Sequence, residues 1–108
     1  MYYVSKRVEV AGAHRLALTY ESPCQNLHGH NWIIDVHCRS EKLDENGMVV
    51  DFKKIKNFVN TLDHKYINDI LPFNPTAENI ARYLCQNIEN CYKVEVRESE
   101  GNVAIYEV

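Results

Sequence analysis

The sequence contains no apolar run long enough to cross a lipid bilayer. No uninterrupted apolar stretch is longer than the four residues at 103–106, whereas a membrane-spanning helix needs about 20 apolar residues. The N-terminal residues also lack the apolar core of a secretory signal. We therefore expect a cytosolic protein without a membrane partner.

An excess of basic residues is missing as well. Twelve Lys and Arg residues stand against fifteen Asp and Glu residues, which gives a formal net charge of −3. This balance does not favour nucleic acid or anionic lipid as a partner. Repeats and low-complexity segments are also absent. A chain of 108 residues with 45% hydrophobic and 25% charged residues is typical of a single folded domain, here residues 1–108.

A disulfide framework is not expected, although the chain has four cysteines. Cys24, Cys38, Cys85 and Cys91 are widely spaced and accompany no export signal, and the cytosol keeps thiols reduced. Cys38 and Cys85 fall on apolar faces of predicted elements, where thiols serve as packing residues. Cys24 lies close to two histidines and is instead a candidate metal ligand or nucleophile.

Alternation of apolar and polar residues predicts four strands, at residues 2–10, 30–39, 92–99 and 103–107. Two helices are predicted between the second and third strands, because apolar residues recur at helical spacing after Asp51 and after Thr76. Both of these residues are suitable N-caps. The Asn46-Gly47 pair predicts a turn, after which residues 48–50 fold back onto the second strand.

The predicted order of elements is β-β-α-α-β-β. Strands that follow one another in pairs favour an antiparallel sheet, so the predicted fold class is α+β, with a four-stranded antiparallel sheet and two helices on one face. A sheet this small leaves two open edges with few residues that block pairing. We expect other copies of the chain to close these edges, which predicts a homo-oligomer.

The strongest chemical signal is a pair of histidines, His28 and His30, on either side of a glycine. If the second strand begins early, both imidazoles leave the same face and could begin a zinc site. His14 follows the first strand, and pairing of the two strands would bring it close. Three histidines with an open position describe a catalytic zinc, whereas Cys24 as a fourth ligand would make the site structural. The third possibility is that these side chains are simply solvated.

Two further clusters carry titratable groups. Asp63 and His64 follow the first helix, where the carboxylate could orient the imidazole for proton transfer, or the imidazole could simply complement the helix dipole. Glu98 falls on the apolar face of its strand, where an acid needs a partner. That partner could be Arg7, Arg15 or the guanidine-like edge of a heterocyclic ligand, unless the strand has already turned Glu98 into solvent.

The order of several motifs resembles the 6-pyruvoyl-tetrahydropterin synthase superfamily over nearly the whole chain. The matching pieces are Ala13-His14-Arg15-Leu16, Cys24 with His28-Gly29-His30-Asn31, Gly47-Met48-Val49-Val50-Asp51-Phe52, Leu62-Asp63-His64-Lys65, Pro75-Thr76-Ala77-Glu78-Asn79 and Arg97-Glu98-Ser99. The resemblance implies the tunnelling fold, in which three sheets join into a barrel and two such trimers stack as a hexamer. It also implies an active site between subunits.

The resemblance implies a role for each matching residue. His14, His28 and His30 would be the zinc ligands. Cys24 would be the catalytic thiol, completed by Asp63 and His64. Glu98 would hold the amino-pyrimidinone edge of a pterin, and Thr76 would contact the pterin ring.

Three residues separate Cys24 from His28, and this spacing resembles the 6-carboxy-5,6,7,8-tetrahydropterin synthase branch, which feeds queuosine and deazapurine synthesis. The branch implies a zinc-dependent lyase that converts 7,8-dihydroneopterin triphosphate to 6-carboxy-5,6,7,8-tetrahydropterin, acetaldehyde and triphosphate. The alternatives are 6-pyruvoyl-tetrahydropterin synthase activity on the same substrate and a non-catalytic zinc module.

Overall fold

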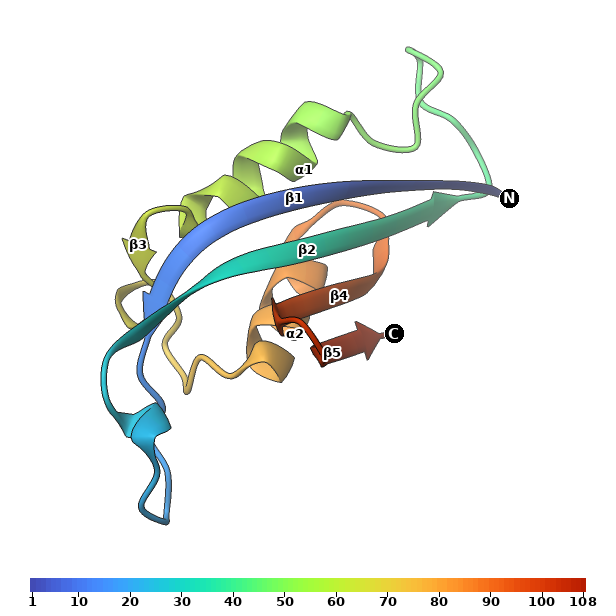
Figure 1. The fold of residues 1–108 in the computed structure, drawn as a ribbon. Coiled ribbons are helices and arrows are strands. Elements are labelled where there is room, and N and C mark those ends of the chain that lie inside the picture. Colours follow the sequence, from blue (N-terminus) through green and yellow to red (C-terminus); the bar gives the residue numbers. More distant parts are fainter.

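A computed structural model describes residues 1–108 as one five-stranded sheet with two α-helices. The strands are β1 (Tyr2–His14), β2 (His28–Ser40), β3 (Lys65–Tyr66), β4 (Cys91–Ser99) and β5 (Asn102–Glu107), and the helices are α1 (Phe52–Val59) and α2 (Ala77–Asn87). Single 3₁₀ turns cover Pro23–Gln25, Asn60–Leu62 and Ile67–Asp69. The strands lie side by side in the order β3-β1-β2-β4-β5 (Figure 1).

The sheet is mixed and five-stranded, so the prediction of four antiparallel strands is wrong in part. The four predicted strands are present and pair antiparallel. The additional strand, β3, has only two residues and pairs parallel to β1 at Gly12 and Ala13. Two residues are too few to show an alternating pattern, and this pairing depends on contacts with a strand more than 50 positions earlier in the chain.

The predicted return of residues 48–50 onto β2 is also wrong. The turn itself forms, with Gly47 at φ +80° and its N–H donating to Asp44 O. The Asp44 carboxylate then accepts hydrogen bonds from the N–H groups of Asn46 and Met48. These bonds close a compact loop, and Val49 and Val50 enter the core from it rather than from a strand.

Both helices cover the same face of the sheet, as predicted. Asp51 and Thr76 cap the two helices by accepting from Lys53 N and Asn79 N, at 2.8 and 3.1 Å. The core contains apolar even-numbered residues of β1, β2 and β4 together with the inward residues of both helices, among them Val10, Trp32, Ile34, Val94, Ile55 and Leu84. None of the helices is long and apolar enough to cross a membrane.

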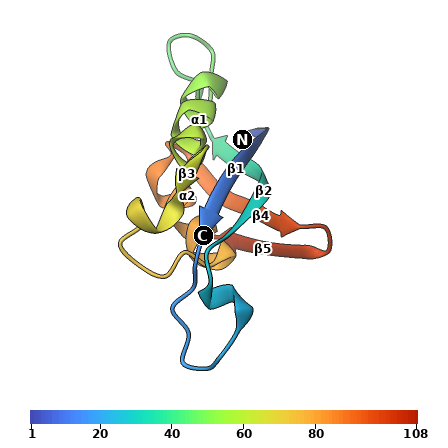
Figure 2. The same cartoon turned by 60° about the vertical axis from the view of Figure 1, so that its left-hand side comes forward.

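The β1–β2 pair is longer than predicted and sets the shape of the molecule. It extends in register from Tyr2 opposite Ser40 to His14 opposite His28, and the chain measures 50 × 26 × 24 Å. Residues 15–27 connect these strands and project beyond the sheet as a separate loop, as both views show (Figures 1 and 2). His14 is therefore the last residue of β1 rather than a residue beyond its end.

Gly12 in β1 is packed too closely to accept a side chain. A Cβ atom there would lie 3.0 Å from Ile67 Cδ1 and 3.3 Å from Trp32 Nε1. We expect Gly12→Ala to lower the free energy of unfolding by about 1–3 kcal/mol through overpacking, measured by urea unfolding. The matched control is Gly29→Ala on the neighbouring strand, where the nearest atom is 3.7 Å away. Equal stability of the two variants would contradict this account.

Candidate metal centre

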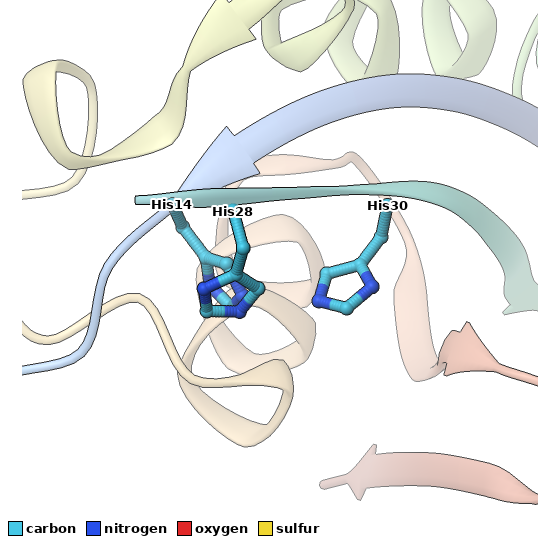
Figure 3. Close-up of side chains that lie close together, drawn as sticks. All are labelled: His14, His28 and His30. Atoms are coloured by element: carbon cyan, nitrogen blue, oxygen red, sulfur yellow. The ribbon is translucent and has the colours of Figure 1, made fainter. Parts of the chain in front are cut away.

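Three histidines meet at the end of the β1–β2 pair. His14 lies opposite His28 and Gly12 lies opposite His30, so the antiparallel register alone brings the three positions together. Residues of equal parity share a face of a strand, and Figure 3 shows the three rings on the same side of the sheet. Their candidate ligand atoms all lie within 4.8 Å of one another. This group of three could hold one metal ion.

Main-chain carbonyl groups fix the tautomers of two of the rings. His14 Nδ1 lies 2.7 Å from Pro75 O, and His28 Nδ1 lies 2.7 Å from Asn26 O. A carbonyl oxygen only accepts, so each Nδ1 carries the proton and each Nε2 keeps its lone pair. Such bonds on the far nitrogen are how proteins orient histidine ligands toward a metal. His14 and His28 are thus prepared to donate through Nε2.

Two buried ring nitrogen atoms of this group are suited to binding a cation. His14 Nε2 and His30 Nε2 are buried without a hydrogen-bond partner, which is costly for a polar atom unless another group satisfies it. Burial is the main cause that lowers the pKa of both rings. Lowered pKa values favour the neutral imidazole, which is the form that binds metals. The donor set of three imidazoles is suited to zinc.

Cys24 lies in the 3₁₀ turn Pro23–Gln25 and is half-buried. Its N–H donates to the Ser22 hydroxyl at 3.2 Å, and its carbonyl accepts from Leu16 N at 2.8 Å. The thiol does not belong to the group of ligand atoms formed by the three histidines. The arrangement therefore offers three protein ligands rather than a closed set of four.

Asp63 and His64 form a pair at the edge of the sheet. Asp63 Oδ2 lies 3.0 Å from His64 Nδ1, and Asp63 Oδ1 accepts from Ala11 N at 2.8 Å. The Ala11 N–H, followed by the His64 ring, lowers the pKa of the Asp63 carboxyl, which keeps it ionised. The His64 side chain is 82% exposed and its backbone has φ +55°, a region that non-glycine residues rarely adopt. The carboxylate thus orients a largely exposed imidazole.

The Asp63–His64 pair lies at the β1 edge of the sheet, where His64 N donates to Ala11 O. A cavity of about 550 Å³ there is lined by His64 together with Ala11, Ala13, Asn31 and the candidate ligand His30. No hydrogen bond joins Cys24 to Asp63 or to His64. Within one chain, the structure does not bring the predicted Cys-Asp-His set together.

Glu98 lies beside the histidine group. Its Oε1 is 3.3 Å from His30 Nε2, although the two atoms are not aligned as a hydrogen bond. The carboxylate is 27% exposed and borders a cavity of about 320 Å³ that also reaches Ala77, the residue after Thr76. The predicted partner Arg7 instead binds Asp35 on the other face, with a 2.8 Å contact. Glu98 is therefore available to a ligand.

Sequence patterns gave no signal for several contacts around these residues. His37 is half-buried and pairs with Glu95 at 2.7 Å on the helix-free face. The carbonyl groups of Pro75 and Asn26 were not candidates, because a main-chain oxygen is common to every residue type. Thr76 caps α2 as predicted, by accepting from Asn79 N, and its hydroxyl proton remains free to donate to a ligand.

Comparison with known proteins gives consistent matches over nearly the whole chain. A family model described as 6-pyruvoyl tetrahydropterin synthase matches residues 3–108. The chain is 34% identical to the 6-carboxy-5,6,7,8-tetrahydropterin synthase of Synechocystis sp., covering 98% of this chain and 93% of that protein. It is 29% identical to the 6-pyruvoyl tetrahydrobiopterin synthase of Homo sapiens, covering 95% and 89% of the two chains.

A solved structure supports the same relationship. The 6-pyruvoyl tetrahydropterin synthase of Caenorhabditis elegans superposes with a TM-score of 0.76 at 26% sequence identity, covering 99% of this chain and 95% of that chain. The resemblance drawn from the ordered motifs is thus confirmed, and the chain belongs to the 6-pyruvoyl tetrahydropterin synthase family.

Proposed function

We propose that this family member is a zinc-dependent lyase that converts 7,8-dihydroneopterin triphosphate to 6-carboxy-5,6,7,8-tetrahydropterin, acetaldehyde and triphosphate. The observation that carries the proposal is the convergence of His14, His28 and His30, with two buried Nε2 atoms that lack a partner. The spacing of Cys24 and His28 and the relative from Synechocystis sp. support the carboxy branch.

The three histidines would hold the zinc ion and leave a position for the substrate. Bound there, zinc would supply a Lewis acid for the side-chain hydroxyl groups of the pterin. Glu98, next to His30, would accept two parallel N–H bonds from the amino-pyrimidinone edge of the ring. The Thr76 hydroxyl, at the N-terminus of α2, would contact the same ring.

Proton transfer would belong to Cys24 and to the Asp63–His64 pair. Cys24 would act as a thiolate at the substrate side chain, and His64, oriented by Asp63, would carry protons on the other side. Because the pair is not joined to Cys24 within one chain, it would serve the Cys24 of a neighbouring copy. This favours the homo-oligomer, a trimer or hexamer, that the open sheet edges and the family resemblance lead us to expect.

The product assay tests the proposed function directly. Purified protein loaded with zinc is incubated with 7,8-dihydroneopterin triphosphate, and the carboxy, pyruvoyl and hydroxymethyl pterins are separated by chromatography. We expect the 6-carboxy product together with acetaldehyde. The 6-pyruvoyl product alone would move the chain to the other branch, and no consumption of substrate would contradict a catalytic role.

Replacing Glu98 should weaken substrate binding without affecting the metal. Glu98→Gln keeps the size of the side chain but removes the charge that strengthens both hydrogen bonds. We expect KM to rise at least about tenfold, which corresponds to about 1.4 kcal/mol of lost binding, with an unchanged zinc content. Glu95→Gln is the matched control, because Glu95 lies on the same strand but pairs with His37 on the opposite face. An unaltered KM for Glu98→Gln would remove Glu98 from the substrate site.

A further inference from the structure

Two asparagine side chains hold the segment that follows His14. The Asn68 amide accepts from Arg15 N and donates to Arg15 O, both at 2.9 Å. The Asn74 amide makes the same two bonds with Ala17, at 2.9 and 3.0 Å. A primary amide has a donor and an acceptor in one plane, so each asparagine replaces the two bonds that a neighbouring strand would supply.

The residue between the two held positions is bonded to the candidate catalytic cysteine. Leu16 N donates to Cys24 O at 2.8 Å. The segment thus behaves as a short strand, with the asparagines on one side and the turn that carries Cys24 on the other. A second bond, from Gln25 Nε2 to Leu18 O at 3.2 Å, lies on the same side as Cys24.

Both asparagines belong to well-anchored parts of the chain. Asn74 O accepts from Thr76 N and from Asn79 Nδ2, each at 2.9 Å, which ties Asn74 to the N-terminus of α2. The next residue, Pro75, accepts from His14 Nδ1. Asn68 follows Ile67, which is buried in the core. The anchors are therefore fixed to the same elements that orient the metal ligand.

The loop that carries Cys24 has little packing of its own. Residues 15–27 project beyond the sheet (Figure 1) and include exposed Tyr20 and Leu27. None of these residues is fully buried. Hydrogen bonds, rather than apolar contacts, must therefore fix its position, and the asparagine pair supplies four of them.

We infer that Asn68 and Asn74 are positioning residues that set the location of the Cys24 thiol relative to the three histidines. The expected effect on the reaction rate rests on the proposed function, whereas the expected effect on the position of the Cys24 turn does not. The two amides hold Arg15 and Ala17, and Leu16 between them holds the Cys24 turn. A small displacement of a reacting group lowers the reaction rate strongly.

The test uses Asn74→Ala, with Asn87→Ala as the matched control. Asn87 lies in the last turn of α2, and its amide donates only to Tyr83 O in the same helix. Alkylation of Cys24 by iodoacetamide is followed by mass spectrometry of its peptide, and exchange of the Ala17 amide hydrogen is followed by NMR. We expect both rates to rise at least about fivefold in Asn74→Ala, as expected for local release of a hydrogen-bonded loop, and to stay within twofold of the original protein in Asn87→Ala.

Activity provides a separate result. In zinc-loaded Asn74→Ala, kcat should fall at least about tenfold while KM changes less and the zinc content is unaltered. Asn74→Asp is isosteric but cannot donate to Ala17 O, and Asn68→Ala removes the other pair of bonds. These two variants keep the test valid if Asn74→Ala fails to fold. Exchange of the Ala17 amide should rise in Asn74→Ala, and exchange of the Arg15 amide should rise in Asn68→Ala. Unchanged exchange of these amides together with unchanged alkylation of Cys24 in the folded variants would overturn the inference, whereas inactivity of the original protein would count against the proposed function alone.

Discussion

Cys24→Ala should abolish turnover of 7,8-dihydroneopterin triphosphate while leaving about one zinc ion per chain. Loss of a general acid or base costs about 100- to 10,000-fold in rate. The metal should stay, because the ligand group consists of His14, His28 and His30 without the cysteine. Steady-state kinetics and atomic absorption on the same preparation check both statements.

Cys91→Ala is the matched control for this experiment. Cys91 is also half-buried and is a free thiol, but it lies on β4 opposite Cys38 of β2. Cys38 is ten positions along β2 from His28, at the other end of the strand. We expect this variant to keep its activity. Loss of zinc from Cys24→Ala would make Cys24 a ligand and would replace the catalytic proposal with the structural zinc module.

His28→Ala should remove both metal binding and activity. His28 is the best ligand to replace, because it is only half-buried, whereas fully buried His14 also packs against Trp32 with ring centroids 4.9 Å apart. We expect zinc affinity to fall by more than about 100-fold, beyond what loss of an outer partner costs. Turnover should fall at least about 100-fold with the loss of Lewis-acid stabilisation.

The control for His28→Ala is His37→Ala, measured by zinc titration and kinetics. His37 lies on the same strand but on the opposite face, where it contacts Glu95. The His37→Ala variant should bind zinc and turn over substrate as the original protein does. Full zinc affinity in His28→Ala would show that the metal lies elsewhere.

The alternating pattern of β1 and β2 is sufficient to predict which side chains share a face. It predicts the histidine group, because His28 and His30 have the same parity as core residues Trp32 and Ile34. The end of β1 is harder to predict. Residues 11–13 are Ala-Gly-Ala, whose small side chains show no contrast between the two faces, so the strand continues to His14 without a local signal.

Contacts between distant segments are the part that the sequence does not predict. The pairing of β3 with β1 and the bonds from Asn68 and Asn74 to residues 15 and 17 join positions more than 50 apart. An asparagine that holds a distant backbone looks the same in a sequence as one that caps a nearby turn. The same holds for His37, whose partner Glu95 lies on a strand that is paired only in the fold.

X-ray absorption at the zinc edge of the resting protein tests the central proposal most directly. We expect three imidazole nitrogen atoms and at least one oxygen atom at about 2.0–2.2 Å, with no sulfur in the coordination shell. A sulfur scatterer at about 2.3 Å, or a shell with fewer than three imidazoles, would contradict it.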